Sequence, residues 1–127
     1  MEFNYCVMNK NVVRQKSFDF ALRIVEIYKH LSREKKEFVL SKQMLRSGTS
    51  IGANIEEAEA SMSKAEFSAK VSVAYKEARE TGYWLKLLFH SNYLDKQVFD
   101  SLFLNVDELC KLLYSILKSS GRIRDTN

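Results

Sequence analysis

The sequence predicts an all-α protein that forms an up-down-up-down antiparallel four-helix bundle. Apolar residues recur at alternating steps of three and four along four segments of the chain, the spacing that keeps one stripe of a helix turned toward a partner. Proline is absent, which long helices tolerate better than a fold of many strands and turns. The 127 residues fit one domain with one hydrophobic core, flanked by short flexible N- and C-terminal tails.

The apolar stripes predict a first and a second helix, and the second is expected to end near Ala60. The stripe of the first helix consists of Ala21, Ile24, Tyr28 and Leu31. The stripe of the second consists of Met44, Gly48, Ile51, Ile55, Ala58 and Met62.

Residues 47–57 (SGTSIGANIEE) are expected to be helical, because the second stripe passes through them without a break. The glycine patterns of phosphate-binding loops are absent. Gly48 and Gly52 each destabilise a helix interior by about 1 kcal/mol relative to alanine, which indicates that they admit a large side chain. In an antiparallel hairpin that turns near Met62, facing positions have numbers that sum to about 124, and we call this pairing level matching. It places the two glycines opposite residues 72–76 of the third helix, where Tyr75 is the large side chain expected to fill the space.

The third helix is expected to begin at Lys64, because residues 63–66 (SKAE) form a capping box. In that motif the Ser63 oxygen accepts a backbone amide, and the Glu66 carboxylate reaches back to the cap. The short link makes the second and third helices antiparallel. The stripe of the third helix consists of Phe67, Val71, Ala74, Ala78, Thr81, Leu85 and Leu88.

A break at residues 90–95 (HSNYLD) separates the third helix from the fourth. Asn92 suits a left-handed helix end, and Asp95 suits an N-cap. Gly121 is expected to terminate the fourth helix. The stripe of this helix consists of Leu102, Val106, Leu109, Leu113 and Ile116.

A polar stripe lies beside the apolar stripe of the second helix, with a counterpart on the third. Level matching places Arg46 and Ser47 opposite Glu77 and Glu80. It also places Asn54 opposite Lys70. Such contacts either fix the register of the helices or line a binding groove or a subunit interface, and the spacing is compatible with both. This polar interhelical stripe consists of Arg46, Ser47, Ser50, Asn54, Glu57, Glu77 and Glu80, continued by Ser61 and Trp84.

Basic residues are concentrated in the first third of a chain whose net charge is +4. Residues 10–46 carry ten Lys/Arg against four Asp/Glu, whereas residues 47–81 carry four against six. This excess fits a surface that faces a polyanion, or an ordinary solvated face. The candidates for contact with nucleic-acid phosphates are Arg14, Lys16, Arg23, Lys29, Arg33, Lys35, Lys36 and Lys42, with Arg122 and Arg124 in the C-terminal tail.

Cysteine usage and hydropathy predict a soluble cytoplasmic protein. Cys6 and Cys110 lack the spacing of a zinc site or a disulfide framework, which is typical of a reducing compartment. The N-terminus is too polar for a signal peptide, and no uncharged apolar run approaches the roughly 20 residues of a membrane span. No membrane association is expected.

No cofactor is expected, since the Glu-x-x-His pairs of di-iron bundles and the CxxCH haem motif are both absent. One catalytic alternative involves Arg23 and His30, which lie two turns apart on one helical face. An arginine that holds a phosphate and a histidine that transfers protons can cleave RNA. This pair resembles the loose signature of helical HEPN-type ribonucleases, and it is the less favoured alternative.

Residues 45–88 resemble the four-helix bundle proteins encoded inside intervening sequences of bacterial 23S ribosomal RNA genes, also described as S23-type ribosomal proteins. The pattern of that family is Arg-Ser-x-x-Ser-Ile-x-x-Asn-Ile-x-Glu-Ala, followed by Phe and by Glu-x-x-Glu-Thr-x-Tyr-Trp-Leu. The first helix, from Lys16 through Leu31, also resembles that of the family. The pattern is matched by Arg46, Ser47, Ser50, Ile51, Asn54, Ile55, Glu57, Ala58, Phe67, Glu77, Glu80, Thr81, Tyr83, Trp84 and Leu85.

The resemblance implies a left-handed bundle without established enzymatic activity that binds RNA of its own genetic neighbourhood. Related bundles are accessory proteins of the reverse transcriptases of diversity-generating retroelements, where they form basic ring-like pentamers that bind nucleic acid and the polymerase. A homo-oligomer, and specifically a pentamer, is therefore expected. RNA and a reverse transcriptase or another protein are the partners that the resemblance implies.

The leading hypothesis is a non-enzymatic, oligomeric bundle that binds structured RNA or a nucleoprotein partner through phosphate contacts. The alternative is a protein–protein adaptor that uses the polar interhelical stripe and does not bind nucleic acid. Surplus aromatic residues suit either subunit contacts or wider packing inside the monomer. They are Phe18, Phe20, Phe38, Phe99 and Phe103.

Overall fold

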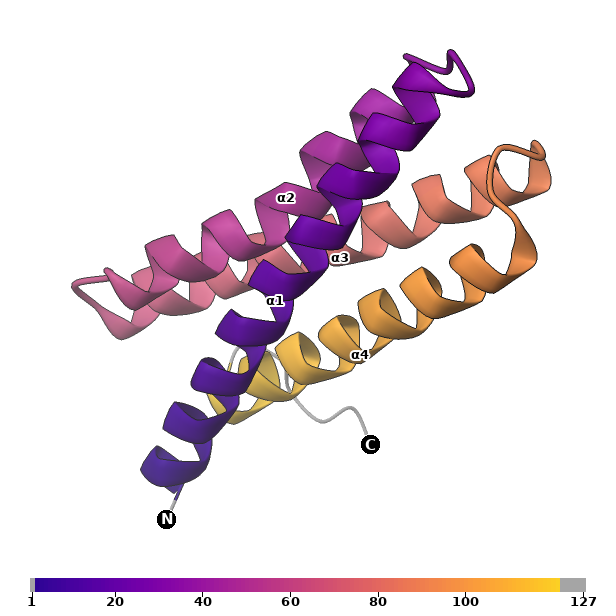
Figure 1. Cartoon of the computed structure of the whole chain (residues 1–127). Coiled ribbons are helices and arrows are strands. Elements are labelled where there is room, and N and C mark those ends of the chain that lie inside the picture. Colours follow the sequence, from indigo (N-terminus) through magenta and orange to yellow (C-terminus); the bar gives the residue numbers. More distant parts are fainter. Residues whose placement is uncertain (1, 122–127) are drawn as a thin grey trace.

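The computed structural model describes residues 2–121 of the chain and the side chains of residues 11–121. The described residues form four helices and no strand (Figure 1). The helices are α1 (Glu2–Arg33), α2 (Leu40–Glu59), α3 (Lys64–His90) and α4 (Lys96–Ser119). The predicted all-α four-helix bundle is therefore confirmed.

Each helix packs against two neighbours, because α1 and α3 both lie against α2 and α4. The α1–α2 and α3–α4 turns lie at one end of the bundle (Figure 1). The α2–α3 turn lies at the other end, together with the N-terminus of α1 and the C-terminus of α4. Consecutive helices are thus antiparallel, as their short connections predict.

The hydrophobic core consists mainly of the predicted stripes. Ile24, Met44 and Leu85 are all completely buried, and burying each such side chain contributes about 1.5–3 kcal/mol. The prediction for Met62 was wrong, because this side chain is 92% exposed. α2 ends at Glu59, so Met62 lies in the turn, beyond the point where helical spacing directs a side chain inward.

The first helix is longer than the sequence predicts. α1 begins at Glu2, where a flexible tail was expected. Its buried stripe continues toward the N-terminus through Phe20, Ser17 and Val13, none of which is more than 2% exposed. The hydroxyl of Ser17 donates to the Arg14 carbonyl at 3.0 Å. A serine that donates a hydrogen bond within its own helix can therefore occupy the core. Because serine is polar, this part of the buried stripe of α1 could not be recognised from apolar spacing in the sequence.

The surplus phenylalanines fall into two groups. Phe20 is buried in the core, and Phe99 and Phe103 pack partly against it, which corresponds to wider packing inside the monomer. Phe18 and Phe38 are instead 60% and 52% exposed. Only these two of the five present most of their rings at the surface.

The glycines of α2 face α1 rather than α3. A Cβ atom at Gly48 would lie 3.0 Å from two side-chain carbons of Ile24. One at Gly52 would lie 3.4 Å from Oγ of Ser17. The prediction that Tyr75 fills this space was wrong, because Tyr75 packs against Tyr114 of α4 with ring centroids 6.1 Å apart.

The predicted N-caps of α3 and α4 and the left-handed residue between these helices are confirmed. Ser63 accepts from the Glu66 amide at 3.1 Å, although the Glu66 carboxylate reaches the Met62 amide rather than that of Ser63. Asp95 accepts from the Val98 amide at 2.9 Å. Asn92 has the expected positive φ of 69°.

The start of α2 is held by Glu37, a cap that was not predicted from the sequence. Its carboxylate accepts from the amides of Val39, Leu40 and Ser41 at 2.9, 3.1 and 2.6 Å. Burial acts to raise the pKa of Glu37, but these amides outweigh it and hold the pKa below its ordinary value. The Glu37 carboxylate thus accepts hydrogen bonds from backbone amides at the start of α2, which have no partner within the helix.

Candidate nucleic-acid interface

The polar interhelical stripe joins α2 to α3. Arg46 forms an ion pair with Glu77 at 3.2 Å and a second one with Glu80. The indole of Trp84 donates to the same Glu80 carboxylate at 2.9 Å. These contacts have the geometry that level matching predicts for Arg46.

Deeper in the bundle, Thr81 donates to the buried hydroxyl of Ser47 at 2.9 Å. Toward the α2–α3 turn, Lys70 pairs with Glu57 at 2.8 Å. The amide of Asn54, expected opposite Lys70, donates to the Ser50 carbonyl within its own helix at 2.8 Å. Ser50 in turn donates to the Arg46 carbonyl. Most polar side chains of the stripe therefore form hydrogen bonds or ion pairs within α2 or between α2 and α3.

Three of the basic candidates on α1 form ion pairs with carboxylates of the bundle. Arg14 donates to both oxygens of Glu56 on α2, at 2.6 and 2.9 Å, and this hydrogen bond raises the pKa of Arg14 and lowers that of Glu56. Lys16 pairs with Glu108 on α4 at 2.6 Å. Lys29 pairs with Glu26 on α1 at 3.3 Å. These carboxylates partly neutralise the middle of the predicted basic face.

Arg23 is also directed toward α4. Its guanidinium donates to Ser101 at 2.9 Å and to the side-chain oxygen of Asn105. His30 lines a cavity of about 420 Å³ between the end of α1 and the α3–α4 turn, where Lys35 also lies. The structure thus places Arg23 and His30 in different surroundings and does not bring them together around one site.

The remaining four basic candidates lie in and beside the α1–α2 turn. Their side chains are exposed and form no ion pair with any residue in the described part of the chain. The turn contains Glu34 as well, but the other carboxylate, Glu37, is buried against backbone amides. This basic turn, as we call it, consists of Arg33, Lys35, Lys36 and Lys42.

The basic turn also carries exposed apolar surface. Phe38 is 52% exposed and Val39 is 72% exposed, and both follow closely after the lysine pair in sequence. Cations beside an exposed aromatic ring suit a flexible polyanion that offers both phosphates and bases. The predicted contacts Arg122 and Arg124 lie outside the described residues.

Two chemical possibilities find no support among the described residues. No group of three or more His, Cys, Asp or Glu side chains in this part of the chain is arranged to hold a metal ion. Within the same residues, no helix combines the length and the hydropathy needed to cross a membrane.

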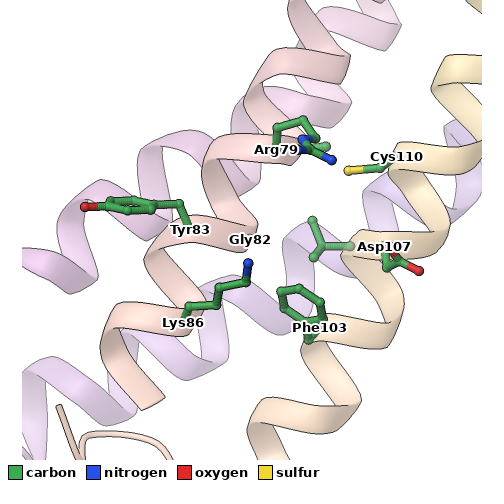
Figure 2. Close-up of a pocket in the computed structure, with 9 residues that line it drawn as sticks. Arg79, Gly82, Tyr83, Lys86, Phe103, Asp107 and Cys110 are labelled. Atoms are coloured by element: carbon green, nitrogen blue, oxygen red, sulfur yellow. The ribbon is translucent and has the colours of Figure 1, made fainter. Parts of the chain in front are cut away.

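A groove between α3 and α4, which was not predicted from the sequence, is lined in part by Arg79, Gly82, Lys86 and Phe103 (Figure 2). Its volume is about 270 Å³. Arg79 and Lys86 are seven positions apart on α3 and therefore share a face. That spacing is visible in the sequence, but the facing residues of α4 become apparent only in the folded chain.

Comparisons with known proteins agree with the resemblance. The model of the 23S rRNA-intervening sequence protein family matches residues 9–115. A crystal structure of a protein of unknown function from the S23 ribosomal protein family of Bacteroides thetaiotaomicron is 54% identical, with a TM-score of 0.85. The match covers 87% of this chain and 98% of that one. Among curated proteins there is no match. The chain therefore belongs to the 23S rRNA-intervening sequence protein family.

Proposed function

We propose that this protein is a non-enzymatic, oligomeric RNA-binding bundle of the cytoplasm, and that the basic turn is its main RNA contact. The proposed RNA-binding surface is smaller than the one predicted from the sequence. Of the eight described candidates, it assigns the main contact to the four in the basic turn, since Arg14, Lys16, Arg23 and Lys29 are engaged within the bundle.

The observation that carries this proposal is the absence of intramolecular ion pairs at the basic turn, among the residues that the structure describes. A lysine already paired with a carboxylate must give up that pairing, at least in part, to bind a phosphate. An exposed, unpaired lysine releases only water and counterions, so its phosphate contact is more favourable. Glu37 strengthens the argument, because its buried carboxylate is held by backbone amides and does not reach outward to the lysines.

The family to which the chain belongs supports RNA as the polyanion. Its members are described as proteins of 23S rRNA intervening sequences. Lysine and arginine side chains on a helical turn contact phosphates rather than base edges. Binding is therefore expected to depend weakly on sequence and strongly on salt concentration.

A homo-oligomer, which we propose to be a pentamer, would repeat the basic turn around a ring and make binding multivalent. Exposed apolar side chains on the outer surfaces of α1 and α4 suit such subunit contacts. Phe18 and Leu22 of α1 are 60% and 53% exposed, and Leu104 of α4 is 69% exposed. Large exposed apolar residues of this kind are enriched in subunit interfaces.

The test is a titration of the protein with RNA transcribed from its own locus at several salt concentrations. The variant Lys35→Gln/Lys36→Gln should bind more weakly at low salt. Its plot of log affinity against log salt should also be less steep, by about 0.7 for each phosphate of a single strand that the variant no longer neutralises. The matched control is Lys64→Gln/Lys76→Gln, which removes two exposed lysines of α3.

The control variant should bind like the wild type. Equal losses of affinity in the two variants would mean that only net charge matters and would refute the assignment to the basic turn. Affinity that does not change with salt would refute phosphate binding altogether. Measuring the mass of the free protein in solution tests the pentamer separately.

A further inference from the structure

The groove between α3 and α4 combines a floor of small and apolar residues with a cation near each end (Figure 2). In Figure 2, Arg79 and Lys86 extend from α3 toward α4, with Gly82 between them. Phe103 and Cys110 face them from α4. The groove lies beside the middle turns of these helices, whereas the basic turn lies at the end of the bundle.

The close packing of α3 against α4 does not require a glycine at position 82. A Cβ atom there would meet Phe103 at 3.7 Å and Val106 at 3.9 Å, which are ordinary van der Waals contacts. Gly48 differs, because its Cβ atom would lie 3.0 Å from Ile24. Glycine destabilises a helix interior relative to alanine. Gly82 is itself buried, so the missing side chain leaves space at the bottom of the groove that the packing of the helices does not require.

The charges in the groove favour an anion. Arg79 is exposed and forms no hydrogen bond or ion pair with any residue of the described chain. The Lys86 ammonium lies 5.5 Å from the centroid of the Phe103 ring, within range of a cation–π contact. Asp107 is the carboxylate among the lining residues, and it is paired with Lys111 at 3.1 Å.

Cys110 adds no opposing charge to the groove. Burial raises the pKa of its thiol above the ordinary value, so the sulfur stays protonated and neutral near neutral pH. The groove thus presents a guanidinium at one end, and an ammonium beside an aromatic ring at the other. Between them lie the largely buried residues Gly82 and Val106, which line the bottom of the groove.

We propose that this groove binds a small organic anion with an aromatic ring, its anionic group held by Arg79 and its ring lying over Gly82 against Val106 and Phe103. A guanidinium fork matches the oxygens of a carboxylate, sulfonate or phosphate. The seven-residue separation from Arg79 to Lys86 spans about 10 Å along the helix, so the two cations contact different parts of one ligand. This binding is independent of the RNA contact at the basic turn.

The test uses 8-anilinonaphthalene-1-sulfonate, whose fluorescence rises in an apolar site, with the full-length protein. The probe should bind saturably. Arg79→Gln and Gly82→Ala should each weaken its binding by about tenfold. Gly82→Ala should at the same time leave the melting temperature unchanged or raise it, because alanine favours the helix. A more stable variant with weaker binding distinguishes a ligand site from a structural role.

Two controls separate this site from general adsorption of the probe. Val73→Ser removes an exposed apolar residue of α3, and Lys96→Gln removes an exposed cation of α4; neither residue lines the groove. Both variants should bind the probe like the wild type. Displacement by adenosine monophosphate would identify the ligand class as a nucleotide, and displacement by 4-hydroxybenzoate would identify it as an aromatic acid.

Several results would overturn the proposal. These are unsaturable binding of the probe, unchanged affinity in Arg79→Gln or Gly82→Ala, and a lower melting temperature in Gly82→Ala. A changed solution mass of either variant with unchanged probe affinity would assign the groove to a subunit contact instead. The basic-turn variants test RNA binding and leave the groove unchanged. The two proposals are therefore tested independently of each other.

Discussion

A Cβ atom at Gly48 would lie 3.0 Å from both Cγ1 and Cγ2 of Ile24, a side chain with no exposed surface. Ile24 has little freedom to move away, because a β-branched residue in a helix has one strongly preferred rotamer. This close approach of α2 to α1 accounts for a glycine in the middle of a helix.

Gly48→Ala is therefore expected to destabilise the fold by about 1 kcal/mol. Overpacking a core costs about 1–3 kcal/mol, and the better helix propensity of alanine offsets about 1 kcal/mol of that. Urea denaturation measures the change. The added variant Ile24→Ala should cost less in the Gly48→Ala background than alone, because it removes the Cγ1 and Cγ2 atoms that the new methyl group would meet.

Gly52→Ala is the control for this prediction. A Cβ atom there would lie 3.4 Å from Oγ of Ser17, which is near an ordinary contact distance. The substitution should be close to neutral. If both glycine variants changed stability equally, the contact between Gly48 and Ile24 would not be the cause.

Features of the fold that depend on neighbouring residues were predicted from the sequence. The caps at Ser63 and Asp95 lie within three residues of the amides that they satisfy. The apolar stripes likewise follow from helical spacing alone. The partner of Gly48 could not be found in this way, since a helix in this bundle has two neighbours and level matching considers only the one that is joined by a short turn.

The candidate interface was predicted less completely. Sequence spacing indicated the pairing of Arg46 with Glu77 and Glu80, because an antiparallel hairpin fixes which residues share a level. It did not reveal that Arg14 and Lys16 are paired with Glu56 and Glu108. Those carboxylates lie far away along the chain, so only the packing of α1 against α2 and α4 identifies them.

Glu37→Gln is expected to destabilise the protein at neutral pH by about 2 kcal/mol, since it removes a buried charge that accepts three backbone amides. The pKa of Glu37 is lowered in the folded state. Its contribution is therefore fully present above the unfolded pKa and is lost as the pH falls through the folded pKa. Urea denaturation across this acid range measures the difference between variant and wild type.

The two proteins should converge in stability at the acid end of that range. Glu34→Gln serves as the control, because the amides at the start of α2 donate to Glu37 and not to this exposed glutamate of the same turn. A constant difference between Glu37→Gln and wild type at every pH would contradict the role of the charge.

Thr81→Val is expected to destabilise the bundle more than Arg46→Gln. The hydrogen bond from Thr81 to Ser47 is buried. Its loss leaves the Ser47 hydroxyl with only the long 3.4 Å bond to the Met44 carbonyl, and an incompletely satisfied buried group costs about 1–3 kcal/mol. The Arg46 side chain is 49% exposed, so its ion pairs contribute about 0–1 kcal/mol. Urea denaturation at low and high salt tests the ranking, and the effect of Arg46→Gln should shrink in high salt. The reverse ranking at low salt would show that the exposed ion pairs dominate.

His30→Ala is expected to leave RNA as intact as the wild-type protein does. An arginine–histidine ribonuclease needs both groups within reach of one phosphate. Here the Arg23 guanidinium donates to Ser101 and Asn105, while His30 lines a separate cavity near Lys35. End-labelled RNA incubated with wild type, His30→Ala and Arg23→Gln, and then separated on a denaturing gel, measures cleavage, with a mock purification as the control. If the wild type cleaves RNA and both substitutions abolish the cleavage, the prediction is wrong and the two residues form a catalytic pair. Arg23 would then have to leave its partners on α4 when RNA binds.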